Sequence, residues 1–304
     1  MPSLRSTMRY LFCLAPALTV AAPAGIDARQ EPAPPAPPAG GLTDVDIQST
    51  SALTAEHLEA AFYKNGFAKF PASDFLALGL TEADVQSLVK VGETEATHVT
   101  TLLSAIAGAG AVPVEPCQYN FDAAFASAQT MVATARILEA VGVSAYLGAA
   151  PLIQSGDVLS AAASIVTVEA RHQALIRLLS GAEAVPSAFD TALGPRAVFT
   201  LAAQFIRSCP EGSNLNIQAF PSISLQNPEL AQVGQNLQLA DAGQPSGGQF
   251  CAFVVSGATQ FSPLTNGNCL IPQNLSGETY MMITKSQSTA DAEVLAGPSV
   301  IQPS

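Results

Sequence analysis

The chain has 304 residues, of which 48% are hydrophobic and only 12% are charged, and its formal net charge is −12 at pH 7. This length and composition indicate a globular protein with one large domain or two ordinary ones. No run of Lys and Arg offers a footprint for phosphate backbones, which argues against nucleic acid as a partner.

Residues 1–24 have the pattern of a secretory signal peptide. Two arginines precede an apolar run over residues 10–22, and Ala-Pro-Ala at 22–24 is typical of a cleavage site. The run is too short for a transmembrane anchor and is interrupted by Pro16. We therefore expect an exported protein without a membrane anchor, located in the extracellular space or the cell wall.

Export changes the interpretation of the cysteines, because an oxidising compartment favours disulfides. Cys13 would be lost with the signal peptide, and four cysteines remain, namely Cys117, Cys209, Cys251 and Cys269. Four cysteines allow three pairings. The sequence changes character between the second and the third, so we favour Cys117 with Cys209 and Cys251 with Cys269. Asn274-Leu275-Ser276 is an acceptor sequence for N-glycosylation in an exported chain.

After the signal peptide, composition and hydrophobic periodicity divide the chain into three segments. Residues 25–42 are too rich in Pro for regular structure and predict an extended linker. Residues 43–210 show helical periodicity and predict a helical domain of long helices. We expect these helices at Asp44–Tyr63, Thr81–Ala107, Asp122–Ala150, Gly156–Ser180 and Pro195–Ser208, with Thr81 and Asp84 as a capping pair.

Residues 211–304 contain short β-prone runs separated by Gly, Pro and Asn turns. The clearest runs are FCAFVV (250–255), TYMMIT (279–284) and VLAGPSVI (294–301). About 94 residues of this kind suit a small all-β domain, and we expect a sandwich of the immunoglobulin type.

Acidic residues and histidines recur at fixed positions in the predicted helices. Glu95 and His98 are three residues apart, and Glu169 and His172 repeat this spacing. A separation of three residues places a carboxylate and an imidazole on one face of a helix. The two other long helices carry Glu56 and Glu139.

The phrases LTAEHLEAAFYKNGFAKF, EATHVTTLLSA and GVSAYLGAAPLI resemble secreted fungal ferritin-like proteins grouped with desiccation- and stress-related proteins. The resemblance covers residues 43–210, and the β-rich tail is similar as well. It implies a mainly α fold, with a ferritin-like four-helix bundle plus one extra helix. In the ferritin-like superfamily, two helices each supply a Glu and two each supply a Glu-x-x-His motif to a dinuclear metal site. The implied ligands here are Glu56, Glu95, His98, Glu139, Glu169 and His172.

The chemistry of the predicted helices favours a metal. Between Ala123 and Gly156 the only charged residues are Arg136 and Glu139, so this helix is expected to be buried. A buried carboxylate is costly unless it is protonated, hydrogen-bonded or coordinated. Two divalent cations would cancel the charge of four glutamates. An oxygen and imidazole ligand set without thiolate favours two iron or manganese ions over structural zinc.

Two tyrosines repeat a further spacing. Tyr63 follows Glu56 by seven residues, and Tyr146 follows Glu139 by seven. Seven residues are two helical turns, so each tyrosine lies on roughly the same face as its glutamate. We interpret both as candidate hydrogen-bond donors to the ligand carboxylates, although they could also be ordinary core aromatics.

Several charged residues and two glycines each allow more than one structural interpretation. Glu59 is one turn from Glu56 and is its rival as a ligand, with the tyrosine spacing favouring Glu56. We expect His57 to face away from the site, at the surface or in an interhelical polar contact. Glu93, Arg136 and Arg171 are expected to be solvated, although Arg136 could instead compensate a site carboxylate. Gly142 and Gly148 could permit close helix approach or simply weaken their helix.

Two functions remain open at this stage. The first is a secreted metalloprotein that activates oxygen or removes peroxide in oxidative, desiccation or nutrient stress. The second is a non-enzymatic wall or surface protein in which the β domain makes the contacts. The sequence has no G-x-S-x-G motif of a serine hydrolase and no phosphate-binding glycine loop preceding a helix. The oligomeric state is not predicted.

Overall fold

The computed structural model describes residues 52–303, except for 109, 212, 214, 216, 227–230 and 242–244. The predicted signal peptide, the Pro-rich linker and the first residues of the expected helical domain lie outside the described residues.

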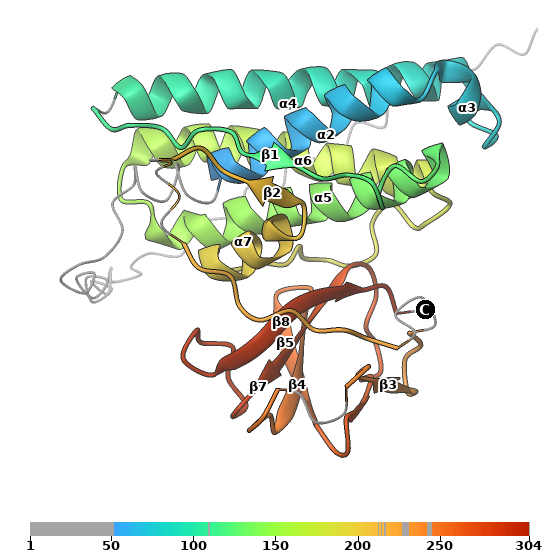
Figure 1. The fold of residues 1–304 in the computed structure, drawn as a ribbon, viewed down its shortest axis with the longest axis vertical. Coiled ribbons are helices and arrows are strands. Elements are labelled where there is room, and N and C mark those ends of the chain that lie inside the picture. Colours follow the sequence, from blue (N-terminus) through green and yellow to red (C-terminus); the bar gives the residue numbers. More distant parts are fainter. Residues whose placement is uncertain are drawn as a thin grey trace, which may run out of the picture. The chain divides into compact units, whose positions relative to one another are not determined.

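Four long helices form a bundle made of two hairpins, whose arrangement is shown in Figure 1. Helix α2 (Leu53–Lys69) packs against α4 (Glu82–Gly108), and α5 (Ala128–Ala149) packs against α6 (Gly156–Leu179). The hairpins meet through contacts of α2 with α5 and of α4 with α6. A long connection joins α4 to α5 along the bundle, as expected for a ferritin-like bundle.

Local sequence signals account for several helix ends. Thr81 Oγ1 accepts a hydrogen bond from Asp84 N, and Asp84 Oδ2 accepts one from Thr81 N, so the predicted capping pair at the start of α4 is confirmed. Ser155 caps α6 by accepting a hydrogen bond from Val158 N. Gly181, with φ +76°, follows the end of α6, where a left-handed residue favours glycine.

The first predicted helix ends later than expected, at Lys69 instead of Tyr63. Asn65 and Gly66 are weak helix formers, but Gly66 is buried, and a Cβ there would lie 2.3 Å from Met131 Cε. Packing of α2 against α5 therefore overrides local propensity. A short helix that follows, α3 (Ala72–Leu76), was not predicted from the sequence.

Two other predicted helices are shorter than expected. Helix α5 starts after Ser127, whose side chain accepts a hydrogen bond from Thr130 N, and not at Asp122. Helix α7 (Pro195–Ala203) stops before the expected end at Ser208. The last residues of that prediction form β2 (Ile206–Ser208), which pairs with β1 (Gln118–Tyr119) in the connection between α4 and α5.

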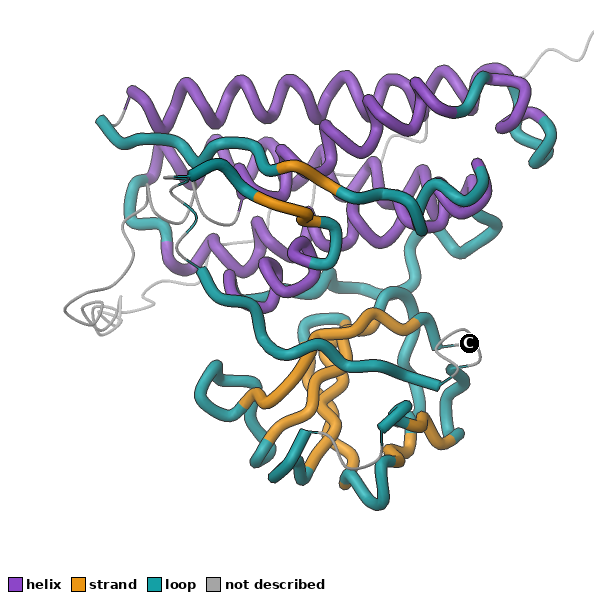
Figure 2. The backbone as a smooth tube through the Cα atoms, viewed as in Figure 1, coloured by secondary structure: helices purple, strands orange, loops and turns teal. Residues whose placement is uncertain are grey.

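The C-terminal region is built from antiparallel strands (Figure 2). The three predicted strands are confirmed as β4 (Phe250–Val255), β7 (Thr279–Thr284) and β8 (Val294–Ile301). They form a sheet of order β5-β4-β7-β8 with β5 (Ala258–Pro263). A second sheet pairs β3 (Asn236–Gln238) with β6 (Asn268–Leu270). The all-β region is thus as expected, whereas an immunoglobulin-like topology stays a prediction.

Both expected disulfides are confirmed. Cys117 bonds to Cys209 and ties the segment before β1 to the residue after β2. Cys251 bonds to Cys269 and joins β4 to β6, so it links the two C-terminal sheets. Asn274, the predicted glycosylation acceptor, is exposed in a turn.

Polar side chains connect the helices to the C-terminal sheets. Tyr280 on β7 donates a hydrogen bond to the backbone oxygen of Ala140 at 2.9 Å, and its hydroxyl lies 2.8 Å from Ser144 Oγ. Glu278 accepts hydrogen bonds from Arg136 Nε at 2.5 Å and from Arg177 Nη1. The expectation that Arg136 is solvated is therefore wrong, because it pairs with Glu278 across the two regions.

Among the described residues, the segment Ala128–Leu152 is long and apolar enough to cross a membrane by length and composition. However, 67% of its most apolar window is buried inside the structure. It contains α5, so its apolarity reflects a position in the centre of the bundle.

The Glu278 ion pairs generate a prediction about stability. Glu278→Ala would leave Arg136 and Arg177 without their carboxylate in a largely buried setting, which typically costs about 3–5 kcal/mol. We expect urea unfolding to show a loss of this size. Glu93→Ala is the control, because the Lys90–Glu93 pair is exposed and such pairs contribute at most about 1 kcal/mol. Equal losses in the two variants would contradict the prediction.

Candidate metal centre

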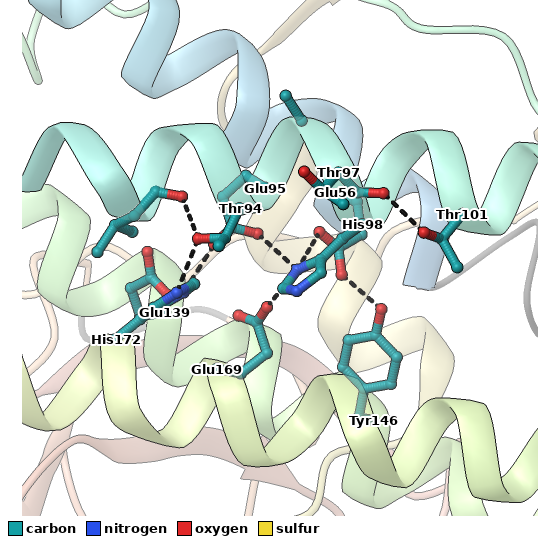
Figure 3. Close-up of polar contacts among 12 residues, drawn as sticks. Glu56, Thr94, Glu95, Thr97, His98, Thr101, Glu139, Tyr146, Glu169 and His172 are labelled. Atoms are coloured by element: carbon teal, nitrogen blue, oxygen red, sulfur yellow. Dashed lines mark hydrogen bonds and ion pairs between the residues drawn. The ribbon is translucent and has the colours of Figure 1, made fainter.

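Six side chains from the four long helices meet in the bundle interior (Figure 3). The four glutamates are fully buried at 0% exposure, and both histidines are buried as well. Helices α2 and α5 each supply one carboxylate, and α4 and α6 each supply a carboxylate with an imidazole three residues later. The structure therefore brings together all six residues singled out in the sequence: Glu56, Glu95, His98, Glu139, Glu169 and His172.

The six residues form two overlapping groups. Glu56 and His98 belong to the first group, and Glu139 and His172 belong to the second. Glu95 and Glu169 belong to both. Within each group the possible ligand atoms all lie within 4.8 Å of one another. A donor set of this kind, with four carboxylates and two imidazoles, is compatible with a metal site.

The histidine nitrogens show why a hydrogen-bond network alone fits poorly. His98 Nδ1 lies 3.3 Å from Glu56 Oε2 and 3.1 Å from Glu95 Oε2. The same nitrogen lies 2.9 Å from Glu169 Oε1. A ring nitrogen carries at most one hydrogen, so it cannot donate well to three oxygens. Three carboxylate oxygens that lie this close to one imidazole nitrogen are typical of ligands that surround a cation.

Nδ1 of His172 lies close to two carboxylates. His172 Nδ1 lies 2.7 Å from Glu95 Oε1 and 3.2 Å from Glu139 Oε2. In addition, Oε2 of Glu169 accepts no hydrogen bond from any residue that the structure describes. A buried oxygen without a partner is costly, and a cation would satisfy it.

Both predicted tyrosines donate hydrogen bonds to the cluster. Tyr63 donates to Glu139 Oε1, and Tyr146 donates to Glu56 Oε1. Each tyrosine therefore binds the glutamate of the other helix and not the one seven residues before it. Seven residues span roughly 10.5 Å along a helix, which is beyond hydrogen-bond reach, whereas the packing of α2 against α5 brings the other glutamate close.

Thr94 orients His172 and was not identified from the sequence. Its hydroxyl lies 2.6 Å from Val91 O and 3.0 Å from His172 Nε2. A hydroxyl has one hydrogen, which the backbone oxygen accepts, so Thr94 accepts the hydrogen of Nε2. In the neutral imidazole, this tautomer leaves the Nδ1 lone pair available as a ligand atom for a cation.

Glu59 is a fifth buried carboxyl beside the cluster, although it belongs to neither group. Gly142 makes room for it. A Cβ at Gly142 would lie 2.7 Å from Glu169 Oε2 and 3.0 Å from Glu59 Oε1. Close approach is also the role of Gly148, where a Cβ would lie 1.8 Å from Leu193 O. The choice between Glu56 and Glu59 depended on tertiary packing, because the two lie one turn apart on the same helix.

The remaining charged candidates lie outside the cluster. His57 is buried, and its Nε2 lies 3.2 Å from Val114 O, so it makes a polar contact with the α4–α5 connection and is not at the surface. Glu93 pairs with Lys90 on the exposed face of α4. Arg171 is exposed, as expected.

Burial makes the carboxylates hard to ionise. It raises the pKa of Glu56 to about 8 and raises the pKa of Glu139. It also raises the pKa values of Glu59 and Glu169 well above their usual range, and neighbouring carboxylates add to the effect. Glu95 differs: burial opposes its ionisation, but hydrogen bonds with His172 and His98 outweigh burial and lower its pKa to about 2.

Burial has the opposite effect on the pKa values of the histidines, but the neighbouring carboxylates outweigh it. Burial lowers the pKa of His98, but contacts with Glu169, Glu56 and Glu95 outweigh burial and raise the pKa to about 12. Glu139 and Glu95 similarly outweigh burial at His172 and raise its pKa to about 10. Without metal, protons on these groups neutralise the cluster. Cations must therefore displace protons to bind.

These pKa values predict how the metal-free protein responds to pH. Glu56 binds its proton more tightly in the folded state, with a pKa of about 8 against an ordinary 4.5. Its contribution to stability is complete below pH 4.5 and is lost as the pH rises through about 8. His98 and His172 contribute fully below pH 6.5 and lose stability towards about 12 and about 10. We expect the Tm of chelator-treated protein to fall between pH 5 and pH 9.

Glu56→Gln is the matched variant for this measurement, because it removes the titrating group but keeps the shape. The fall in Tm should be shallower in the variant, since each pKa unit corresponds to about 1.4 kcal/mol. A Tm that rises between pH 5 and pH 9 in the metal-free wild-type protein would contradict the assignment.

Comparisons with known proteins agree with this architecture. Residues 43–182, which span the four long helices, match the family model described as Ferritin-like domain. Protein rds1 of Schizosaccharomyces pombe (strain 972 / ATCC 24843) is 29% identical over 208 residues, which cover 64% of this chain and 50% of rds1. The chain thus spans about half the length of this curated relative. The helical region of the chain is similar to ferritin-like domains and carries a buried carboxylate and histidine cluster compatible with a metal site.

Proposed function

We propose that the helical bundle binds two transition-metal ions, iron or manganese, through Glu56, Glu95, His98, Glu139, Glu169 and His172. The observation that carries the proposal is the convergence of three carboxylate oxygens on Nδ1 of His98 within 2.9–3.3 Å. Four carboxylates would balance two divalent charges, and the imidazoles complete a mixed oxygen and nitrogen set. The donor set therefore fits two cations, and no cysteine sulfur takes part in either group.

The surrounding residues hold these ligands in place. Tyr63 donates a hydrogen bond to one carboxylate oxygen of Glu139, and Tyr146 donates one to Glu56. The second oxygen of each glutamate is left for coordination. Thr94 keeps the hydrogen of His172 on Nε2. Burial of the site excludes water, which strengthens electrostatic interactions within it. Bound iron or manganese would supply oxidation and reduction of oxygen or peroxide.

The wider role that we propose is stress protection outside the cell. The support comes from the N-terminal sequence pattern, the two disulfides and the similarity to ferritin-like domains. In this role the C-terminal sheets are an additional surface that could contact the cell wall. Glycosylation at Asn274 belongs to the same proposal.

Metal content tests the proposed site directly. Protein purified from medium supplemented with iron and manganese should contain about two equivalents of metal per chain by elemental analysis. Glu139→Ala and His172→Ala should each lose at least about half of this metal, because each removes a ligand of one group. Glu93→Ala is the matched control, since this carboxylate lies on the exposed face of α4.

Chelation provides a second readout of the same site. Removal of bound metal should lower the Tm, because a ligand that binds only the folded state stabilises it. Wild-type protein without bound metal, and without any change in Tm on chelation, would contradict the metal site and favour a non-enzymatic surface protein.

A separate prediction concerns Thr94. Thr94→Val keeps the shape of the side chain but removes the acceptor for His172 Nε2. Loss of such an orienting contact typically weakens metal affinity roughly 10- to 100-fold. Competition with a chromophoric chelator measures the change. Thr97→Val is the control, because Thr97 Oγ1 donates to Glu93 O on the exposed side of the same helix. Equal affinities in the two variants would exclude the orienting role.

A further inference from the structure

A pocket of about 210 Å³ lies beside the cluster. It is lined by residues of helices α2, α5 and α7 and of strand β8, so the C-terminal sheet completes its wall. Its surface is mainly aliphatic, with residues such as Leu58, Leu138, Leu201 and Val300. Gln204, an exposed residue at its edge, indicates where the pocket meets solvent.

Glu59 is the charged residue that lines this pocket among the described residues. It is only 2% exposed, and its Oε2 accepts no hydrogen bond from any described residue. A Cβ at Gly142 would lie within 3.0 Å of both Glu59 Oε1 and Glu169 Oε2, so these two carboxyl groups lie against the same glycine. Glu59 therefore lies next to both the pocket and the carboxylate and histidine cluster.

The chemistry of the pocket restricts what it can bind. An enclosed cavity of about 150 Å³ lined by apolar side chains is large enough for benzene, so the pocket here has room for one substituted ring. Aliphatic walls would desolvate a charged ligand at high cost, which favours a neutral molecule. Glu59 is the charged residue on this wall, so its carboxyl would be the partner for a hydrogen-bonding group on that molecule.

We propose that this pocket binds a neutral, phenol-sized organic molecule whose hydroxyl group contacts Glu59. The proposal goes beyond metal binding, because the pocket and Glu59 exist independently of any cation. If the cluster holds metal, the bound molecule lies one side chain away from it. The pocket is then the position for an organic reactant of the centre.

The test uses the full metal-free chain and ¹⁹F NMR, so that a failure of metal binding and a failure of pocket binding are separate results. 4-Fluorophenol should bind with line broadening that saturates, and fluorobenzene should bind more weakly by roughly fivefold or more, because it lacks the hydroxyl. Equal affinity for the two probes, or preferred binding of 4-fluorobenzylamine, would overturn the proposal.

Two variants locate the binding site. Val300→Phe fills the pocket from its half-buried β8 wall and should weaken 4-fluorophenol binding by roughly tenfold or more. Val89→Phe is the matched control, because Val89 is exposed on α4 and does not line the pocket. Circular dichroism and Tm establish that both variants fold. Unchanged binding in a folded Val300→Phe variant would overturn the proposal.

Glu59→Leu tests the polar contact separately and removes a buried carboxyl without a hydrogen-bond partner, so it should fold at least as well as the wild type. This variant should bind 4-fluorophenol and fluorobenzene with similar affinity. A retained preference for the phenol would show that Glu59 does not make the contact, and would overturn the proposal.

Discussion

The central constraint on this protein is the burial of negative charge. Four glutamates with no solvent exposure lie together in the interior of an apolar bundle, and Glu59 adds a fifth carboxyl beside them. Ionised carboxylates at such distances repel one another, and burial penalises each of them further. The fold is compatible with this arrangement only if protons or cations neutralise the cluster. Histidines with raised pKa values fulfil this need without metal, and two divalent ions would fulfil it more completely.

Much of the surrounding structure serves this constraint. The side chains of Tyr63 and Tyr146 reach from one hairpin to the other, and each donates a hydrogen bond from its hydroxyl to a glutamate carboxylate of the opposite hairpin. Because Gly142 has no side chain, the carboxyl groups of Glu59 and Glu169 can lie against its helix. The apolar character of α5, which by composition alone resembles a membrane span, is the consequence of lying at the centre of this assembly.

The C-terminal sheets are attached to the bundle by specific polar contacts. Tyr280 reaches the backbone of α5, and Glu278 receives guanidinium groups from both α5 and α6. Apolar residues of the same strands pack against α5 and α7, so part of the helical core is closed by the sheet. Strand β8 also completes the pocket next to Glu59. This placement gives the β region a structural role at the edge of the site, independent of any role at the surface.

The sequence by itself predicted the helical class and the three main strands, and its resemblance to ferritin-like proteins implied the six residues of the cluster. Periodicity accounts for part of this, because a spacing of three residues places Glu95 with His98, and an apolar helix makes Glu139 conspicuous. Only the tertiary structure decided which side chains meet across helices. Tyr63 hydrogen-bonds to Glu139 and Tyr146 to Glu56, so each contacts the glutamate of the other helix. The hydroxyl of Thr94 contacts His172 Nε2, and Glu59 lines a pocket. Arg136 likewise pairs with Glu278, which lies 142 residues away in the sequence. The physical reason is that contacts between helices depend on packing distances and on small residues at crossings, which local spacing along one chain segment does not encode.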